Sequence, residues 1–373
     1  MGTEDRFAFS VEWLDPMSGV TWKYNLLHQP SSMEIEMFDV KARRTFLKKT
    51  RYESLPTEQL RPGNTVVVYG RQLKVLDYAD AFTRRQLEWQ QQRTCVVIKP
   101  FAVDLLGDIL SALHEAGFLL QGVQMCLLTS TFAQQLWQHD VPSHELGDLV
   151  SELIAGPVVA LDLVAEDAFR RWEAFQQHLS GGKINLGDAC VGSTGPAVAG
   201  HQLSQLFTPS GQVQLSFQGT GTTLCVIKPH AVAQGFAGPI LTTLGQHFRV
   251  TGVRSATLEL AEASSFLEVY REVLPGGELS AMIKELIAGP CLAIELASQD
   301  SASQDGTSSS GYYSTVEALR SLCGPHDPQM ARDLRPHTLR ALYGRDKAQN
   351  AVHCTDLEED APLETGFFFT IMH

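Results

Sequence analysis

The sequence predicts an α+β protein with two ferredoxin-like domains in tandem, preceded by a small all-β, barrel-like domain. Three observations lead to this prediction. Two blocks of sequence occur twice, in the same order and at similar spacing; the first quarter of the chain differs from both copies in pattern and charge; and a chain of 373 residues is too long for one ordinary core. Hydrophobic residues make up 44% of the chain, which is enough for two or three cores.

The first 90 residues show the pattern of an all-β domain. Apolar and polar side chains alternate in short runs, which predict strands at 7–13, 21–27, 33–38, 65–68 and 73–76. Turn residues such as Asp15-Pro16 separate these runs, so we expect a barrel or sandwich over residues 1–90. Residues 1–92 carry 13 basic and 12 acidic side chains, whereas the remainder carries 16 and 30, and the two parts are therefore expected to have separate partners.

The repeat accounts for the rest of the chain. CVVIKPFAV at 95–103 is matched by CVIKPHAV at 225–232, and LIAGPVVALDL at 153–163 is matched by LIAGPCLAIEL at 286–296. Two matching blocks in one order, separated by the size of a domain, indicate a duplicated domain and not a solenoid. We expect the first copy at 91–210, a linker at 211–221 and the second copy at 222–373.

Each copy shows the same order of elements. A β-branched run ending at Lys-Pro predicts a strand, which is followed by helix, strand, more helix up to Gly-Pro, and a third strand. This order favours an antiparallel sheet with helices on one face, the ferredoxin-like arrangement. Residues 180–222 predict a degenerate end of the first copy, and the Ser-rich stretch 298–311 predicts a surface insertion.

Composition excludes several classes of protein. No run approaches the roughly 18 apolar residues of a membrane span, and the first nine residues lack the apolar stretch of a secretory signal. The seven cysteines are dispersed without a C-x-x-C pair, so we expect reduced thiols in the cytosol and no zinc site. The net charge of −13 disfavours nucleic acid as a partner, and no P-loop or G-x-G-x-x-G motif is present.

The second copy carries a set of groups suited to phosphate chemistry. Each has an ordinary structural interpretation when taken alone, because a single Lys or Arg is usually solvated and a single His is usually structural. The set as a whole is what points to function. Its members are Lys228, Tyr270, Arg320, His326, Arg340, Asn350, His353 and Glu364, with Asp356 close after the histidine.

Three motifs in register identify the second copy as a member of the nucleoside diphosphate kinase family. LCVIKPHAV resembles the opening strand of these enzymes, and LRPHTLRALYG at 334–344 resembles their Arg-bearing segment. QNAVHCTD at 349–356 matches their N-x-x-H-x-S-D signature, with Thr355 in the place of serine. The resemblance covers residues 222–373.

This resemblance implies catalysis by covalent transfer. His353 would take the γ-phosphoryl group of ATP and pass it to a nucleoside diphosphate, and Glu364 would hold the other imidazole nitrogen. A neutral imidazole is available near neutral pH because its ordinary pKa is about 6.5. Mg²⁺ would bridge the nucleotide phosphates, with no metal site on the protein itself. The nucleotide would be bound by Lys228, Tyr270, Arg320, His326, Arg340 and Asn350.

Both copies depart from the family pattern. In the second copy Glu278 stands where an aromatic residue normally stacks on the base, and His326 and His337 replace a threonine and a glycine, so we expect reduced activity. The first copy keeps Lys99 but has lost much more. Trp137 is expected at the tyrosine position, Glu173 at the arginine, Thr194 at the histidine and Val191 at the asparagine, which would make this copy inert.

The N-terminal residues resemble a DM10 domain. The resemblance rests on RFAFSVEWLD, TFLKKTR and VVVYGRQLKVLDYAD, and it implies attachment to microtubules in cilia or flagella. The segment 41–51, KARRTFLKKTR, is the most basic of the chain and would suit an acidic partner such as tubulin. On charge alone, a solvated strand and turn fits this segment equally well.

The complete layout resembles a ciliary branch of the nucleoside diphosphate kinase family. It implies a structural component of the doublet microtubules of the ciliary or flagellar axoneme, a microtubule inner protein in the cytoskeleton and cytoplasm. Its partners would be tubulin, other axonemal proteins and, in some contexts, the γ-tubulin complex, with no membrane. The alternative is a soluble nucleoside diphosphate kinase that uses ATP to make other nucleoside triphosphates.

Overall fold

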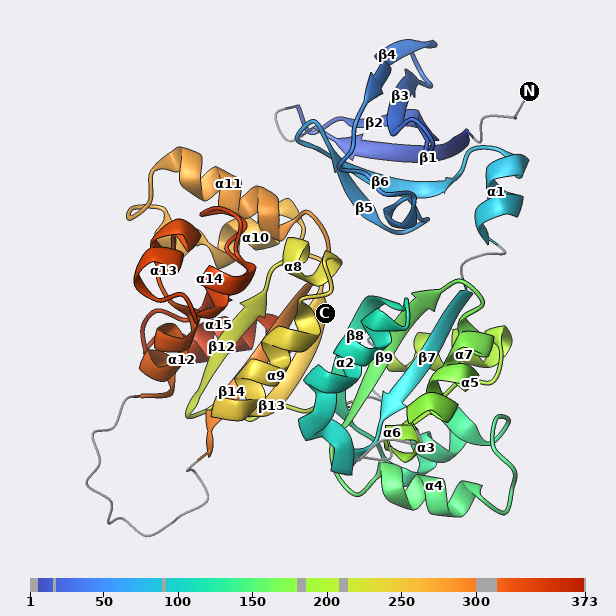
Figure 1. The fold of residues 1–373 in the computed structure, drawn as a ribbon, viewed down its shortest axis with the longest axis vertical. Helices are drawn as coiled ribbons and strands as arrows, with labels where there is room; N and C mark the ends of the chain where they lie inside the picture. Colours follow the sequence, from blue (N-terminus) through green and yellow to red (C-terminus); the bar gives the residue numbers. More distant parts are fainter. Residues whose placement is uncertain are drawn as a thin grey trace. The chain divides into compact units, whose positions relative to one another are not determined.

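The computed structural model describes residues 6–15, 18–88, 92–179, 186–207, 214–299 and 314–371. The chain forms two compact units, residues 1–91 and 92–373, and each is described by itself below (Figure 1). Within the described ranges, no helix combines the length and apolar composition needed to cross a membrane.

The N-terminal unit is a six-stranded antiparallel sheet that curls around its own core. Its strands are β1 (Phe7–Leu14), β2 (Thr21–Gln29), β3 (Glu34–Asp39), β4 (Arg44–Arg51), β5 (Thr65–Val68) and β6 (Arg71–Tyr78). They lie in the order β4-β3-β2-β1-β6-β5, so β4 and β5 are the edges of an open half-barrel. Every second residue of β1 faces inward, and Phe9 and Val11 are completely buried there with Leu26 and Val75.

Two features of this unit differ from the sequence-based expectation. Strand β4 forms where only a basic segment was recognised, because its charged side chains on both faces hide the alternation that marks a half-buried strand. The unit is also not all-β, since helix α1 (Ala81–Glu88) follows the sheet and a 3-10 turn occupies Thr57–Gln59. Asp80 starts α1 by accepting from the Thr83 amide at 2.6 Å, and the Thr83 hydroxyl accepts from the Ala8 amide at 2.8 Å.

The second unit contains both copies in one sheet. The strands of the first copy are β7 (Gln92–Ile98), β8 (Leu119–Leu127), β9 (Val158–Ala165) and β10 (Cys190–Gly192). Those of the second are β12 (Thr222–Ile227), β13 (Phe248–Ala256), β14 (Cys291–Ser298) and β15 (Val352–Cys354). Each copy has its first strand between its third and fourth, which is the ferredoxin-like order, and β8 pairs with β13 to join the halves.

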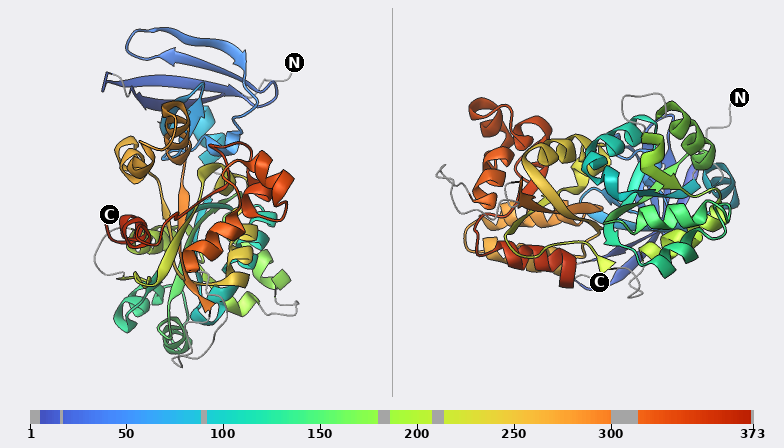
Figure 2. Two further views of the ribbon diagram at one scale, coloured as in Figure 1. Left: turned by 90° about the vertical axis from the view of Figure 1, so that its left-hand side faces the viewer. Right: turned by 90° about the horizontal axis from the view of Figure 1, so that it is seen from below.

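Helices cover both faces of this sheet, so the expectation of helices on one face is wrong (Figure 2). One face packs on α2 (Leu106–Glu115), α5 (Ala168–Leu179), α9 (Ala237–His247) and α12 (Thr315–Cys323). The other packs on α3 (Ser130–Trp137), α4 (Leu146–Leu153), α7 (Pro196–Leu206), α10 (Leu260–Phe266) and α11 (Gly276–Leu286). The strands are correspondingly apolar throughout: all eight residues of β9 are buried.

The two copies share one core where α2 crosses α9. A Cβ atom added to Gly107 would lie 2.3 Å from the Thr242 amide nitrogen, and one on Gly238 would lie 2.3 Å from the Ser111 hydroxyl. The Thr242 hydroxyl donates to Asp108 across this contact at 2.9 Å. Glycine at both crossing points therefore lets the helix backbones approach closely, and a single apolar cluster runs through both copies.

The segment between the copies is more regular than expected. Residues 180–222 include α6 (Leu186–Ala189), β10 and the eleven-residue helix α7, and β11 (Gln214–Leu215) pairs with β8 inside the predicted linker. Glu295 on β14 is fully buried, and its hydrogen bonds hold residues 218–222 in place. Its carboxylate accepts from the amides of Gln218 and Gly219, both at 2.6 Å, and from the hydroxyls of Thr222 and Thr251.

The Ser-rich insertion predicted at 298–311 lies almost wholly outside the described residues. Strand β14 ends at Ser298, and Ser314, the first described residue after the insertion, caps α12. The second copy also has several short helices, which are α8 (Pro229–Ala233), η3 (Glu268–Tyr270), α13 (Pro328–Leu334), α14 (Leu339–Tyr343) and α15 (Ala361–Gly366). Of these, η3, α14 and α15 carry predicted site residues.

Candidate active site

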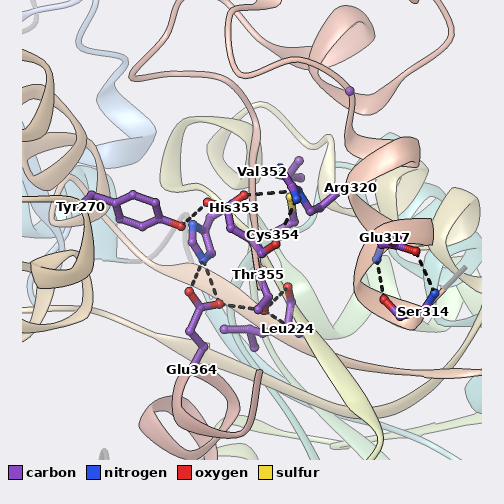
Figure 3. Close-up of polar contacts among 12 residues, drawn as sticks. Leu224, Tyr270, Ser314, Glu317, Arg320, Val352, His353, Cys354, Thr355 and Glu364 are labelled. Atoms are coloured by element: carbon purple, nitrogen blue, oxygen red, sulfur yellow. Dashed lines mark hydrogen bonds and ion pairs between the residues drawn. The ribbon is translucent and has the colours of Figure 1, made fainter. Parts of the chain in front are cut away.

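His353 lies at the centre of the site, on the edge strand β15. This strand pairs with β12, where His353 is opposite Val226, and its side chain is 6% exposed. The Nε2 atom lies 3.1 Å and 3.2 Å from the two carboxylate oxygens of Glu364 on α15 (Figure 3). Thr355 donates its hydroxyl to the same carboxylate at 2.7 Å, so Glu364 is held from two sides.

This contact determines how His353 is protonated. Burial lowers the pKa of His353, but the charge of Glu364 and its hydrogen bond outweigh burial, and the net pKa is raised. An ionised carboxylate only accepts, so Nε2 carries the proton and donates it to Glu364. In the neutral ring the lone pair is therefore on Nδ1, which is the nitrogen able to act as a nucleophile.

Two cationic side chains lie beside His353, one buried and one half-buried. Lys228 follows β12 and is 2% exposed; its ammonium group donates to the Ala348 carbonyl at 2.8 Å. Burial, followed by the charge of Arg340, lowers the pKa of Lys228 to about 7. Arg340 on α14 donates to the carbonyls of Gly324 and Val352 at 2.9 Å and 3.2 Å, which holds its guanidinium group next to β15.

Asp356 connects two more of the predicted residues. The Tyr270 hydroxyl donates to the Asp356 carboxylate at 2.7 Å, and Arg320 donates to the Asp356 carbonyl at 3.0 Å. Burial and this carboxylate raise the pKa of Tyr270, so its hydroxyl stays protonated and remains a donor. The Tyr270 and His353 ring centroids are 6.2 Å apart, which places the phenol at the side of the imidazole.

Asn350 and His326 form the remaining part of the site. The Asn350 amide donates to the His326 carbonyl at 3.0 Å, and its own oxygen is buried with no hydrogen-bond partner among the described residues. His326 Nε2 lies 3.2 Å from a carboxylate oxygen of Glu278. The other oxygen of Glu278 is 3.7 Å from the Lys347 ammonium group. Burial, Arg340 and Lys228 together lower the pKa of His326.

The structure therefore brings the eight predicted residues into one site around β15. Lys228, Arg340 and the Tyr270 phenol lie near His353, and such groups suit transfer of a phosphoryl group, because its transition state spreads negative charge over oxygens. Sequence reasoning missed two supporting elements: Asp356 as the connection between Tyr270 and Arg320, and a buried pair formed by His230 and Glu285. Both lie inside recognised motifs, but their contacts depend on the tertiary structure.

The first copy shows that two predicted correspondences are wrong. Strand β10 pairs with β7 as β15 pairs with β12, and Val191 is opposite Val97 as His353 is opposite Val226. Val191, and not Thr194, thus occupies the histidine position. The Lys99 amide donates to Ala189 as the Lys228 amide donates to Ala351, which places Asp188 at the position of Asn350.

The tyrosine position also needs correction. The Asp140 amide donates to Trp137 as the Tyr270 amide donates to Leu267, so Asp140 replaces the tyrosine and Trp137 is a fully buried core residue. Ser193 donates to Gln202 at 2.6 Å, in the same relation as Thr355 to Glu364. The first copy has therefore kept the hydrogen-bonded frame of the site and lost its histidine.

The fold and this site together define a protein of the nucleoside diphosphate kinase type. The family model described as Nucleoside diphosphate kinase matches residues 92–183 and 221–372, and the chain belongs to this family. Over 389 aligned residues it is 36% identical to nucleoside diphosphate kinase homolog 7 of Mus musculus, covering 99% of this chain and 94% of that protein. The resemblance inferred from the motifs is thereby confirmed.

Relatives that match a smaller part of the chain carry the family name as well. The nucleoside diphosphate kinase of Aquifex aeolicus is 30% identical over 149 residues, which covers 40% of this chain and 93% of that enzyme. A crystal structure of the Aquifex aeolicus nucleoside diphosphate kinase aligns at 28% identity over 40% of this chain and 94% of that one, with a TM-score of 0.34.

Proposed function

We propose that the second copy is a nucleoside diphosphate kinase site that works through a phosphohistidine on His353, and that the first copy takes no part in the chemistry. The observation that supports this most directly is the hydrogen bond from His353 Nε2 to Glu364, which leaves Nδ1 with a free lone pair in a site that also contains Lys228 and Arg340. The first copy, with Val191 in the histidine position, has no equivalent nucleophile.

The proposed reaction has two half-steps. The Nδ1 lone pair attacks the γ-phosphorus of ATP; the bond from phosphorus to the bridging oxygen breaks, and ADP leaves with that electron pair. A terminal phosphate oxygen of a second nucleoside diphosphate then attacks the phosphohistidine, and the imidazole leaves. Lys228, Arg320 and Arg340 stabilise the negative charge in both steps, while Tyr270 and Asn350 donate hydrogen bonds.

Mg²⁺ enters this scheme as part of the nucleotide substrate. Lys228, Arg340 and Tyr270 near His353 are cationic or neutral donors, and Asp356 is engaged by Tyr270 and Arg320. Among the described residues there is no group of three His, Cys, Asp or Glu placed to hold a metal ion. The ion would be held by the phosphates and water, and when bound it would neutralise charge on the transferred group.

Labelling with γ-³²P ATP tests this proposal. The full chain is expected to acquire label that is stable in alkali and lost in acid, and His353→Ala should remove it completely. His201→Ala, which changes an exposed histidine on α7, should leave the label in place. A wild-type chain without acid-labile label, or a His353→Ala chain that keeps it, would show the proposal to be wrong.

Glu278 is expected to limit nucleotide binding. A carboxylate stands where the family stacks an aromatic side chain on the base, and it lies against His326, which is expected to face phosphate. Glu278→Phe should therefore tighten ADP binding by roughly tenfold, the size of a stacking contact of 1–3 kcal/mol. Calorimetric titration measures this change. The control is Glu272→Phe, which changes a glutamate at an exposed position of the second copy. Equal effects of the two variants would contradict this role of Glu278.

We also propose that the chain is a structural component of ciliary or flagellar doublet microtubules. Support comes from the layout of the domains and from β4, an exposed edge strand whose basic residues include Arg44, Lys48 and Arg51. Cationic side chains on both faces of an exposed edge strand suit an acidic protein surface such as that of tubulin, although Arg51 is paired with Glu53 in the structure. The loss of chemistry in the first copy favours this role over that of a freely soluble kinase.

Extraction of axonemes with salt separates these two roles. A component embedded in the microtubule lattice should resist extraction in 0.5 M salt, at which surface electrostatic contacts are strongly screened, whereas a soluble kinase should be released at once. Reversing the charge of Arg44, Lys48 and Arg51 should prevent incorporation into axonemes. Quantitative release by low salt would argue against the structural role and favour the soluble kinase.

A further inference from the structure

The two copies contain the same lysine and the same glutamate in two different arrangements. Lys99 and Lys228 end the matching KP strands, and Glu152 and Glu285 precede the matching LIAGP blocks. In the first copy the two form an ion pair, with Lys99 Nζ 2.7 Å from Glu152 Oε2. In the second copy Lys228 donates to the Ala348 carbonyl instead, and Glu285 is engaged elsewhere.

Glu285 is held by a complete set of donors. One carboxylate oxygen accepts from the His230 amide at 3.0 Å and contacts His230 Nδ1 at 2.6 Å. The other oxygen accepts from the Gln349 side chain at 2.9 Å. The residue is 5% exposed, and the donors hold the pKa of this carboxyl below its ordinary value although burial acts against them. Glu285 is therefore ionised and pointed toward His230.

The copies differ at the residue that makes this arrangement possible. The second copy reads KPHAV and the first KPFAV, so Phe101 stands where the second copy has His230. Phenylalanine has no donor for a carboxylate, and Phe101 is 66% exposed. Where the histidine is missing, the carboxylate pairs with the lysine; where it is present, the carboxylate pairs with the histidine.

We propose that His230 is a positioning residue that keeps Glu285 away from Lys228, so that the Lys228 ammonium group stays free to bind a nucleotide phosphate. This inference rests on the proposed function of the second copy. The residue after Lys-Pro, Phe101 or His230, thus determines whether the lysine can bind a phosphate or forms an ion pair within the protein. Gln349 assists by occupying the second oxygen of Glu285.

The charges around Lys228 make the effect measurable. Arg340, Glu285, Asp346 and Cys354 act on its charge, and His326 and His353 lie within its electrostatic influence. At its present distance Glu285 only partly opposes the effects of burial and Arg340, and the pKa of Lys228 remains at about 7. A direct ion pair with Glu285 would raise this pKa, because an adjacent negative charge favours the charged amine.

The decisive variants are His230→Phe, Glu285→Gln and the two combined. At pH 6, His230→Phe should weaken binding of ADP with Mg²⁺ by roughly tenfold, the size of one charge-assisted hydrogen bond. Glu285→Gln alone should stay within about twofold of wild type, because Lys228 keeps its charge and its freedom. The double variant should recover to within about threefold, because no carboxylate remains to capture Lys228.

A second measurement does not depend on nucleotide. The pKa of Lys228, followed by NMR on ¹³C-lysine protein and assigned with Lys228→Arg, should rise in His230→Phe and return in the double variant. Phe101→His, in the first copy, is the matched control and should leave binding unchanged. Thermal melting establishes that each variant is folded, and His230→Leu replaces His230→Phe if the latter does not fold.

The outcomes separate this inference from the proposed function. Unchanged binding in His230→Phe, a loss that Glu285→Gln does not rescue, or an equal loss in Glu285→Gln alone would overturn the role of His230. An unchanged pKa of Lys228 would overturn it too, even in a chain that binds no nucleotide. Absence of label on wild-type His353 would refute the proposed function and leave the Lys228 measurement intact.

Discussion

Glu364→Ala is expected to slow phosphorylation of His353 by about 100-fold, because the ring loses the partner that fixes its tautomer. In the native site Nε2 donates to Glu364 and Nδ1 keeps the lone pair. Without the carboxylate, the neutral ring populates both tautomers, and the imidazole is free to rotate. Stopped-time labelling with γ-³²P ATP measures the rate, and Glu359→Ala, an exposed change in the preceding turn, should have no effect.

The pH dependence provides an independent check of the same contact. The nucleophile is neutral His353, so its ionisation should make labelling rise with pH through its raised pKa, while Lys228, with a pKa of about 7, loses its charge as pH rises and sets the falling side of the profile. Glu364→Ala removes the group that raises this pKa, and the rise should move to lower pH. The free energy of unfolding should change with pH in the opposite direction. The protonated His353–Glu364 pair stabilises the fold fully below the pKa of histidine in the unfolded chain, and this contribution is lost as pH rises through the raised pKa of His353 in the folded protein. An unshifted rate profile in the variant would contradict this explanation.

Glu295→Leu is expected to lower the free energy of unfolding of the second unit by about 3–5 kcal/mol. Glu295 is fully buried on β14 and accepts four hydrogen bonds, two of them from the backbone amides of Gln218 and Gly219. Leucine would leave these donors buried without a partner. It would also release the segment that leads from the first copy into β12.

Urea unfolding followed by circular dichroism measures this loss. Glu295→Gln should cost less, because its carbonyl still accepts, and Glu173→Leu, at an exposed position on α5, serves as the control. Limited proteolysis should find a new cleavage site near Gln218 in the leucine variant. A destabilisation of less than about 1 kcal/mol would mean that the four hydrogen bonds are readily replaced by water.

The motifs of the second copy were sufficient to locate its site from sequence. QNAVHCTD and the KP strand supplied residues with fixed spacing, and the structure brings Lys228, Asn350 and His353 together as that spacing requires. The first copy has no such signature between 180 and 207. Its residues could be matched to the site residues of the second copy only through backbone hydrogen bonds, which place Val191 opposite Val97.

The other incorrect or missing predictions concern strands and contacts whose surroundings are set by distant parts of the chain. Whether an apolar strand is covered on one face or two depends on where the helices pack, which a local pattern does not record; β9 is buried along its whole length because helices lie on both sides. Strand β4 was missed for the opposite reason, since both of its faces carry exposed charges. The His230–Glu285 pair joins residues 55 positions apart, beyond the reach of any local pattern.

The glycine crossing of α2 and α9, together with the pairing of β8 with β13, has a consequence for the substitutions that the first copy can tolerate. Both copies contribute to one continuous core, so the first copy supports the fold of the second whether or not it does chemistry. Val191 at the histidine position does not disturb this contact, whereas a Cβ atom on Gly107 or Gly238 would lie 2.3 Å from an atom of the facing helix. The crossing therefore restricts the residues of the first copy more tightly than its own chemistry does.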